Sequence, residues 1–392
     1  MSPAMRLLRE KNDYLTLFFS LAAHSCEYRY LEEIEQRISG KIRRTKKICI
    51  NMSKAYFLTI FSVIISILLH ILCKEVDKME RQEKKRRGQI LNILAQSIRK
   101  IIKEEVEDPG KLQEIRMRMG QPLRILKENE ELVLPKGGKP HIVTKEDLRE
   151  TMDYISHYSL YAYENELRQG FITVEGGHRV GVAGKVIMEK DRVKNIQYIS
   201  SLNIRISHEV IGCADALMPY ITVNRQICHT LIISPPCCGK TTLIRDLIRQ
   251  ISDGNQYLRG CSVGVVDERS ELGGCYLGIA QNHLGTRTDV LDCCPKAEGM
   301  IMLIRSMAPQ VIAVDEIGTI EDIHAIEYAM QCGCRMIASV HGLNMDEASK
   351  KPVLGTLIRR RMFQRYVVLG NENGPGEILG IYDERGSVLC RG

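Results

Sequence analysis

The sequence predicts an α/β protein in which a parallel-sheet domain follows a smaller α+β domain. Beyond residue 226, near-continuous apolar segments alternate with helical patterns, as in parallel sheets that helices cover on both faces. A Gly-Lys-Thr loop follows the first of these segments and opens a helix. Between about 112 and 225, short strand and helix patterns mix, which is typical of an α+β domain. We therefore expect three segments, residues 1–78, 79–225 and 226–392.

Length, composition and charge limit the function classes. A chain of 392 residues with 44% hydrophobic content can fill two cores. Of its net charge of +7, residues 1–78 carry +5, so the remaining chain is nearly neutral. We therefore expect no nucleic-acid partner for the main body. The 14 cysteines include no C-x-x-C pair, which argues against structural zinc.

The N-terminal segment contains a membrane-span candidate at residues 55–73, AYFLTIFSVIISILLHILC. Both flanks of this stretch are basic, so its orientation is not indicated. In an alternative interpretation, translation begins at Met79 and residues 1–78 are a mis-called start. The sequence leaves a genuine membrane anchor and a mis-called start equally open.

The segment 79–225 predicts helices and hairpins. After Met79, an amphipathic helix is expected to pack in a soluble domain rather than on a membrane surface. Its apolar face carries Ile90, Leu94, Ile98, Ile101 and Ile102. The stretches EIRMRMGQPLRIL and GFITVEGGHRVGVAGKVI predict hairpins, and residues 144–167 predict a helix with a Thr144–Asp147 capping box.

Four strands are expected after residue 226, and each ends near polar groups. They are ICHTLIIS, SVGVVDE, QVIAVDE and RMIASVH. Ligands of open parallel sheets bind at the carboxyl ends of the strands. A binding site is therefore expected at this edge.

The first strand leads into a candidate phosphate loop. A loop of the form G-x-x-x-x-G-K-[ST] directs backbone N–H groups at phosphates, its lysine reaches the β and γ phosphates, and its hydroxyl binds Mg²⁺. The following helix, KTTLIRDLIRQIS, adds its N-terminal dipole. The first position holds serine instead of glycine, and serine is small enough for the loop to form. The candidate nucleotide-binding residues are Ser234, Pro235, Pro236, Cys237, Cys238, Gly239, Lys240, Thr241 and Thr242.

Further candidates end or flank the other strands. Asp315 and Glu316, about 70 residues beyond the loop, have the chemistry to support Mg²⁺ and to polarise an attacking water. Asp267, Glu268 and Arg269 follow SVGVV, and Ser339 and His341 follow RMIA. Arg287 and Arg305 are candidates for a γ-phosphate contact, in cis or from a neighbouring subunit.

This order of motifs resembles the RecA-like secretion and traffic ATPases, in which such elements are the Asp box, Walker B and His box. From about Met79 to the C-terminus, the chain more narrowly resembles the stage III sporulation protein AA family. The stretches that carry the resemblance are EIRMRMGQPL, GFITVEGGHRVGVAGK, GTRTDVLDCCPKAEGMIMLIRSMAPQVIAVDEIG and GEILGIYDERG. Ser234 and residues 1–78 depart from the family pattern.

The resemblance implies a RecA-like P-loop ATPase that uses ATP and Mg²⁺. It implies a cytoplasmic, membrane-associated hexamer in the mother cell of an endospore-forming bacterium, which powers or assembles the channel to the forespore with the channel's membrane proteins. Lys240 and Thr241 would bind phosphates and Mg²⁺, and Asp315 would support Mg²⁺. Glu316 would be the base. Glu268 and His341 would be the box residues, and Arg205 would reach nucleotide from the N-terminal domain.

Two other functions are open. One is a nucleic-acid-dependent P-loop ATPase, which the near-neutral main body disfavours. The other is a nucleotide-gated scaffold without hydrolysis, which Lys240, Thr241, Asp315 and Glu316 disfavour.

The two cysteines of the phosphate loop suggest a chemical test. Cys237 and Cys238 precede a helix N-terminus, where thiolates tend to be reactive. We expect thiol alkylation to inactivate the protein and MgATP to protect it. Ordinary filling of two loop positions by small residues is the alternative.

Overall fold

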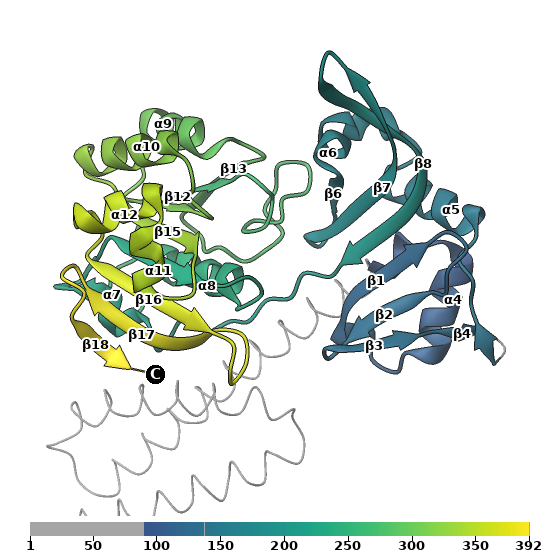
Figure 1. The fold of residues 1–392 in the computed structure, drawn as a ribbon, viewed down its shortest axis with the longest axis horizontal. Helices are drawn as coiled ribbons and strands as arrows, with labels where there is room; N and C mark the ends of the chain where they lie inside the picture. Colours follow the sequence, from purple (N-terminus) through teal and green to yellow (C-terminus); the bar gives the residue numbers. More distant parts are fainter. Residues whose placement is uncertain (1–89, 137, 392) are drawn as a thin grey trace, which may run out of the picture. The chain divides into compact units, whose positions relative to one another are not determined.

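A computed structural model describes residues 90–136 and 138–391. The described chain lies in the compact unit Arg87–Gly392 and forms a six-stranded and an eight-stranded sheet (Figure 1). The span candidate at 55–73 lies outside the described residues. Within the described ranges, we find no helix with the length and hydropathy that a membrane span requires. Each large sheet uses strands from one side of position 225, and the predicted domain division there stays a prediction.

The six-stranded sheet is antiparallel, with the order β3-β2-β1-β8-β7-β6. Its strands are β1 (Leu112–Arg118), β2 (Arg124–Lys127), β3 (Glu130–Val133), β6 (Phe171–Val174), β7 (His178–Glu189) and β8 (Arg192–Arg205). The same segment contains α4 (Gln96–Glu105), η1 (Pro109–Lys111), β4 (Pro135–Lys136), β5 (Lys139–Pro140), α5 (Lys145–Ile155), η2 (Leu160–Tyr163) and α6 (Glu164–Gln169). Both predicted hairpins are confirmed, as β1–β2 and β6–β7.

The predicted helix after Met79 is interrupted within the described residues. Residues 93–95 form a turn, and α4 begins at Gln96. All five predicted apolar positions of this segment are nevertheless at most 2% exposed, in one core with β1 and β8. The segment is therefore part of a packed core, as expected.

The predicted helix at 144–167 is also divided. The capping box of Thr144 and Asp147 is present and starts α5. The helix ends at Ile155 because His157 and Tyr158 have positive φ values of 47° and 63°. Such backbone angles end a right-handed helix, and no glycine or proline in the sequence signals this break.

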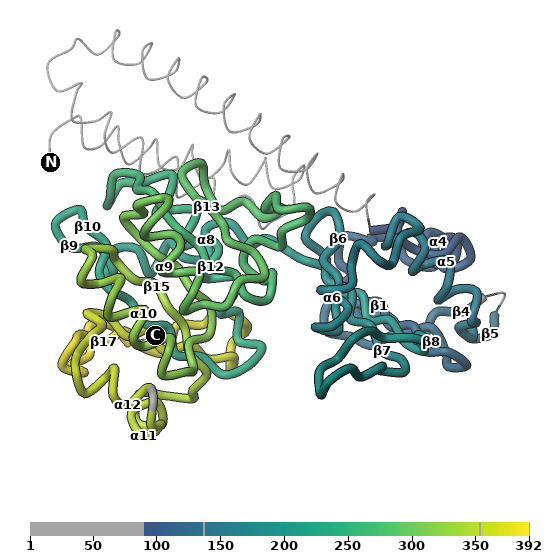
Figure 2. Tube along the Cα trace, turned by 90° about the horizontal axis from the view of Figure 1, so that it is seen from above, coloured from purple at the N-terminus to yellow at the C-terminus, as the bar shows by residue number. Residues whose placement is uncertain are grey.

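The eight-stranded sheet has the order β13-β12-β14-β15-β11-β16-β17-β18. Its strands are β11 (Thr230–Ser234), β12 (Val263–Asp267), β13 (Thr288–Asp292), β14 (Val311–Val314), β15 (Arg335–His341), β16 (Arg365–Gly370), β17 (Glu377–Asp383) and β18 (Val388–Arg391). Its helices are α7 (Met218–Ile221), α8 (Lys240–Asp253), α9 (Lys296–Ser306), α10 (Ile320–Gln331), α11 (Met345–Lys350) and α12 (Pro352–Arg359), and a small ribbon joins β9 (Thr222–Val223) to β10 (Gln226–Ile227). Helices α11 and α12 lie next to each other (Figure 2).

Two apolar cores cover the faces of this sheet. Alternate residues of a strand point to opposite faces, so Ile232 of β11 packs with α8 while Leu231 and Ile233 pack with α9, α10 and α12. All three side chains are fully buried. This burial on both faces explains why the strands read as continuous apolar runs.

One edge of the sheet departs from the prediction of a parallel sheet. The first six strands of the order are parallel, but β17 and β18 are antiparallel additions beyond β16. Only antiparallel neighbours can be joined by a short loop such as 371–376, whereas parallel strands need a crossover. The sheet is therefore mixed.

The strand order identifies the fold class. Strand β15 lies between β11, which leads to the Gly-Lys-Thr loop, and β14, which ends before Asp315. The predicted RecA-like α/β class is confirmed. Because these strands are parallel, their carboxyl ends meet at one edge of the sheet.

Candidate nucleotide-phosphate site

The loop 235–239 connects β11 to α8 at the carboxyl edge of the sheet. Helix α8 has 14 residues, and its N-cap is Gly239, with φ 78°. A left-handed residue here is best supplied by glycine, which fits the Gly-Lys-Thr motif. Thr241 and Thr242 lie in the first turn, half-buried. The N–H groups of this turn have no intrahelical partner, so they suit an anion.

Serine at the first loop position needs no special backbone angle. Ser234 ends β11 in register with His341 of β15, and its side chain is fully buried. Its hydroxyl donates to the Pro235 carbonyl at 2.8 Å. Positive φ in the loop occurs instead at Cys237, 61°, and at Gly239. The unusual serine is therefore compatible with the loop, and the strain falls on Cys237.

Lys240 is at the centre of the candidate site. Its ammonium lies 3.2 Å from Asp315 Oδ1 and 4.0 Å from Glu316 Oε2, with only 9% of its side chain exposed. The Ser339 hydroxyl donates to the same Asp315 oxygen at 2.8 Å. The end of β14 thus faces the first turn of α8, as the motif order predicts.

Glu316 is held on several sides. Its Oε1 lies 3.2 Å from His341 Nε2, and its Oε2 lies 3.3 Å from Arg269 Nη1. Its backbone N–H donates to Asp315 Oδ1 at 2.9 Å, and its φ is 30°. A strained, non-glycine residue that its neighbours hold in place is typical of functional sites.

The acidic turn after β12 divides into two environments. Asp267 is 1% exposed and accepts N–H groups from Glu271 at 2.8 Å and from Gly273 at 2.7 Å. Burial raises the pKa of the Asp267 carboxyl to about 6. Glu268 forms an ion pair with Lys296 of α9 instead of joining Lys240.

The two candidate arginines are not brought to Lys240 within the chain. Arg287 Nη1 donates to the Ser252 carbonyl at 3.0 Å, near the far end of α8, about 18 Å from Lys240 by helix rise. Arg305 is exposed in the last turn of α9, about 13 Å along that helix from Lys296. The cis alternative is therefore wrong for both side chains, because both belong to the amino edge of the sheet. A contact with a neighbouring subunit stays a prediction.

Arg205 is placed on the other sheet. It is exposed at the end of β8 and pairs in register with Glu114 of β1 and Arg179 of β7. Its approach to nucleotide stays a prediction.

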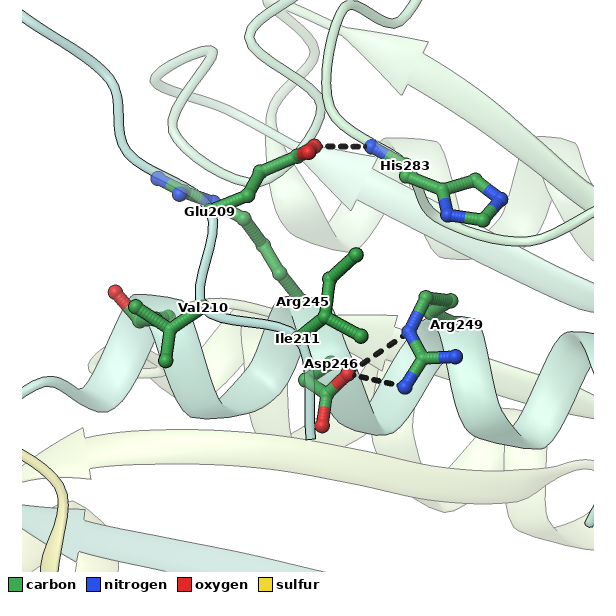
Figure 3. Close-up of a pocket in the computed structure, with 8 residues that line it drawn as sticks. Glu209, Val210, Ile211, Arg245, Asp246, Arg249 and His283 are labelled. Carbon is green, nitrogen blue, oxygen red and sulfur yellow. Dashed lines mark hydrogen bonds and ion pairs between the residues drawn. The ribbon is translucent and has the colours of Figure 1, made fainter. Parts of the chain in front are cut away.

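A small cavity lies on the outer side of α8 (Figure 3). Its volume is about 20 Å³, which is enough for one water molecule. Its walls are Glu209, Val210, Ile211, Thr242, Arg245, Asp246, Arg249 and His283. Arg245 Nη1 donates to the His208 carbonyl at 3.1 Å and its Nη2 donates to the Glu271 carbonyl at 2.9 Å. The cavity thus marks where α8 anchors the segment that enters the sheet.

Sequence reasoning missed two contacts of the site. The ion pair of Glu268 with Lys296 was not predicted, because the two residues are 28 positions apart in the sequence and no local pattern connects them. Sequence reasoning also missed the loop 371–376, whose Gly376 N–H donates to the Cys238 carbonyl at 2.9 Å. The glycine-rich stretch NENGPG was the available signal for this loop.

The topology defines a RecA-like α/β protein, with the Gly-Lys-Thr loop at the carboxyl edge of its sheet. The family model "Sporulation stage III, protein AA" matches residues 83–389, and the chain belongs to this family. It is 42% identical over 305 residues, 78% of this chain and 97% of the relative, to Stage III sporulation protein AA of Bacillus subtilis (strain 168). It is 31% identical over 171 residues to Protein SEEDLING PLASTID DEVELOPMENT 1 of Arabidopsis thaliana, 43% of this chain and 23% of that protein.

Two similar solved structures are titled as an ATPase and as a pilus retraction motor. The ATPase DotB of Legionella pneumophila has a TM-score of 0.47 and 14% identity, over 70% of this chain and 77% of that chain. The pilus retraction motor PilT with bound ADP has a TM-score of 0.46 and 14% identity, over 71% of this chain and 77% of that chain.

Proposed function

We infer that this chain is a Mg²⁺-dependent ATPase of endospore formation. The observation that carries the proposal is the cluster of Lys240, Asp315, Glu316 and His341 at the mouth of the phosphate loop. A buried ammonium that faces two carboxylates at an open sheet edge has the chemistry to exchange these partners for phosphate oxygens.

Each side chain of the cluster has a proposed task. Lys240 and the N–H groups of the first turn of α8 bind the β and γ phosphates. The Thr241 hydroxyl and Asp315 hold Mg²⁺, which neutralises charge on the phosphates when bound. Glu316 orients and polarises the attacking water, and His341 fixes the direction of its carboxylate.

The setting in the cell is proposed from family membership. The ATPase acts in the mother cell, associated with the membrane, with membrane proteins of the channel to the forespore as partners. A hexameric ring is the proposed assembly, in which Arg287 or Arg305 of one subunit reaches the nucleotide of the next. Glu268 is proposed to act within this assembly, and Arg205 from the N-terminal sheet.

The first test is nucleotide binding by the full-length chain. Lys240→Ala removes the ammonium, so we expect ATP affinity measured by calorimetry to fall about 100-fold, a loss near that of a buried charged contact. Lys100→Ala, an exposed position of α4, is the matched control and should bind like the wild type. Equal ATP affinity in wild type and Lys240→Ala would contradict the proposed site.

A second readout separates the ATPase from the scaffold alternative. Wild-type protein that binds ATP should also release phosphate in the presence of Mg²⁺. Tight ATP binding without phosphate release, alone and with membranes of sporulating cells, would instead support a nucleotide-gated scaffold.

A further inference from the structure

We propose that the loop between β16 and β17, residues 371–376, is the nucleoside-recognising wall of the nucleotide site. The inference rests on the proposed nucleotide binding and assigns the part of the site that contacts the base and ribose. It concerns a loop that none of the phosphate-site motifs includes.

The strand order places this loop beside the phosphate loop. Strand β16 is the parallel neighbour of β11, with Ile233 in register with Val368, so both strands end at the carboxyl edge. Strand β15, with His341 at its end, is the neighbour of β11 on the other side. In the strand order, β11 lies between β15 and β16 (Figure 1). The loop 371–376, which follows β16, is therefore expected on one side of the phosphate loop, and the residues that follow β14 and end β15 on the other.

The two loops are in direct backbone contact. The Gly376 N–H donates to the Cys238 carbonyl at 2.9 Å. A Cβ on Gly239 would lie 2.7 Å from Gly376 N, so the packing requires glycine at 239. In a trans peptide the N–H of Gly239 points opposite to the Cys238 carbonyl, away from the loop 371–376. The contact therefore fixes the direction in which Gly239 can donate to a phosphate.

The loop has a defined shape of its own. The Asn373 N–H donates to Glu377 Oε2 at 3.0 Å, and this backbone hydrogen bond lowers the pKa of the Glu377 carboxyl. Gly374 and Gly376 have φ values of 131° and 90°, which only glycine adopts without strain. A shaped loop can recognise a ligand at a smaller entropic cost than a flexible one.

The direction of a bound nucleotide follows from the charges. The Lys240 ammonium points to Asp315 and Glu316, so the terminal phosphate lies on the β14–β15 side of the phosphate loop. A nucleoside triphosphate is an extended molecule, and its base lies at the end opposite to the γ-phosphate. The base and ribose therefore extend toward β16, where Asn371 and Glu372 present exposed amide and carboxylate groups.

The test compares ATP with inorganic tripolyphosphate, which lacks the nucleoside. We would measure the affinity for ATP and the affinity for tripolyphosphate by calorimetry on the full-length chain. The readout is their quotient, the affinity for ATP divided by the affinity for tripolyphosphate. Two variants are used, the double substitution Asn371→Ala with Glu372→Ala, and a replacement of 371–376 by Asn-Gly, a two-residue hairpin turn. The control is Arg385→Ala, exposed in the turn between β17 and β18 at the opposite edge of the sheet.

We expect the quotient to fall about tenfold in the shortened-loop variant and less in the double variant, while the control keeps the wild-type value. If thermal unfolding shows that the shortened loop prevents folding, the double variant decides, and it must lower the quotient. If the ratio of ATP affinity to tripolyphosphate affinity is the same in the variants as in the wild type, the proposal for this loop is wrong, although the chain still binds nucleotide. This includes the case in which a variant loses affinity for ATP and for tripolyphosphate by the same factor. A wild-type chain that binds neither ligand overturns the proposed function instead.

Discussion

The Nε2 atom of His341 lies 3.2 Å from Oε1 of Glu316. The His341 side chain is 40% exposed. If it orients Glu316, His341→Ala should lower the rate of ATP hydrolysis about 10-fold to 100-fold, because proton-transfer groups lose much of their effect when misaligned. ATP affinity should change little, since Lys240 is untouched. His324→Ala, exposed on α10, is the matched control. A parallel loss of affinity and rate would assign His341 to binding instead.

Asp267 links stability to pH. Because burial raises its pKa to about 6, the folded state binds a proton more tightly than the unfolded state. Its contribution to the free energy of unfolding is therefore largest at low pH and declines as pH rises from about 4 to about 6, by about 1.4 kcal/mol for each unit of pKa shift. Denaturant unfolding of wild type and Asp267→Asn should show a difference that falls across this range. A difference that grows with pH would contradict this assignment.

Cys237 is exposed in the phosphate loop, and Cys238 is only 4% exposed. We expect N-ethylmaleimide to modify Cys237 first and to block ATP binding by filling the loop, and MgATP to slow this reaction. Cys237→Ser should keep its ATP binding after this treatment. Cys332→Ser removes another exposed thiol and should lose ATP binding as the wild type does. If Cys237→Ser loses ATP binding at the wild-type rate, modification of Cys237 is not the cause of the loss.

At the scale of elements, α8 connects the phosphate loop to the segment that precedes β11. Asp246 of this helix is 4% exposed and accepts from the Ala214 N–H at 2.9 Å and from Arg249 Nε at 2.8 Å. Asp246→Ala leaves both donors without this acceptor, so we expect a loss of about 3 kcal/mol in the free energy of unfolding. Lys100→Ala breaks an exposed pair and should cost less than about 1 kcal/mol. Denaturant unfolding measures the free energy of unfolding of both variants. If Asp246→Ala loses as little as Lys100→Ala, Asp246 does not anchor this segment.

The elements that sequence predicts well are those with a strong local signal. The strands β11, β12, β14 and β15 are apolar runs because they are buried on both faces, and their polar ends mark the site. The capping box of α5 is similarly local. The breaks before α4 and after Ile155 have no such signal, because neither stretch contains a glycine or a proline.

The structure brings some of the candidate site residues together and leaves others apart, and the site itself stays a prediction. Residues directly after a parallel strand share one edge, so Lys240, Asp315, Glu316 and His341 could be grouped from motif order alone. Arg287 and Arg305 lie between strands, and their distance along the chain does not tell which edge they reach. Glu268 follows a strand but turns to Lys296, a choice that only three-dimensional contacts decide.

In the whole molecule, Arg287 and Arg305 are both exposed and lie away from the Lys240 cluster of their own chain. The proposed ring gives these side chains a role, because the amino edge of one subunit can meet the carboxyl edge of the next. Assembly would then complete the site, so hydrolysis per chain should depend on protein concentration.

The decisive measurement for the proposed ATPase is Mg²⁺-dependent ATP hydrolysis by the full-length chain across a protein concentration series, with Glu316→Gln as the comparison. We expect a hydrolysis rate per chain that rises with protein concentration, and a rate in Glu316→Gln at least about 100-fold lower while ATP still binds. Hydrolysis that Glu316→Gln retains at the wild-type level would contradict the assignment of this carboxylate and, with it, the proposed ATPase site.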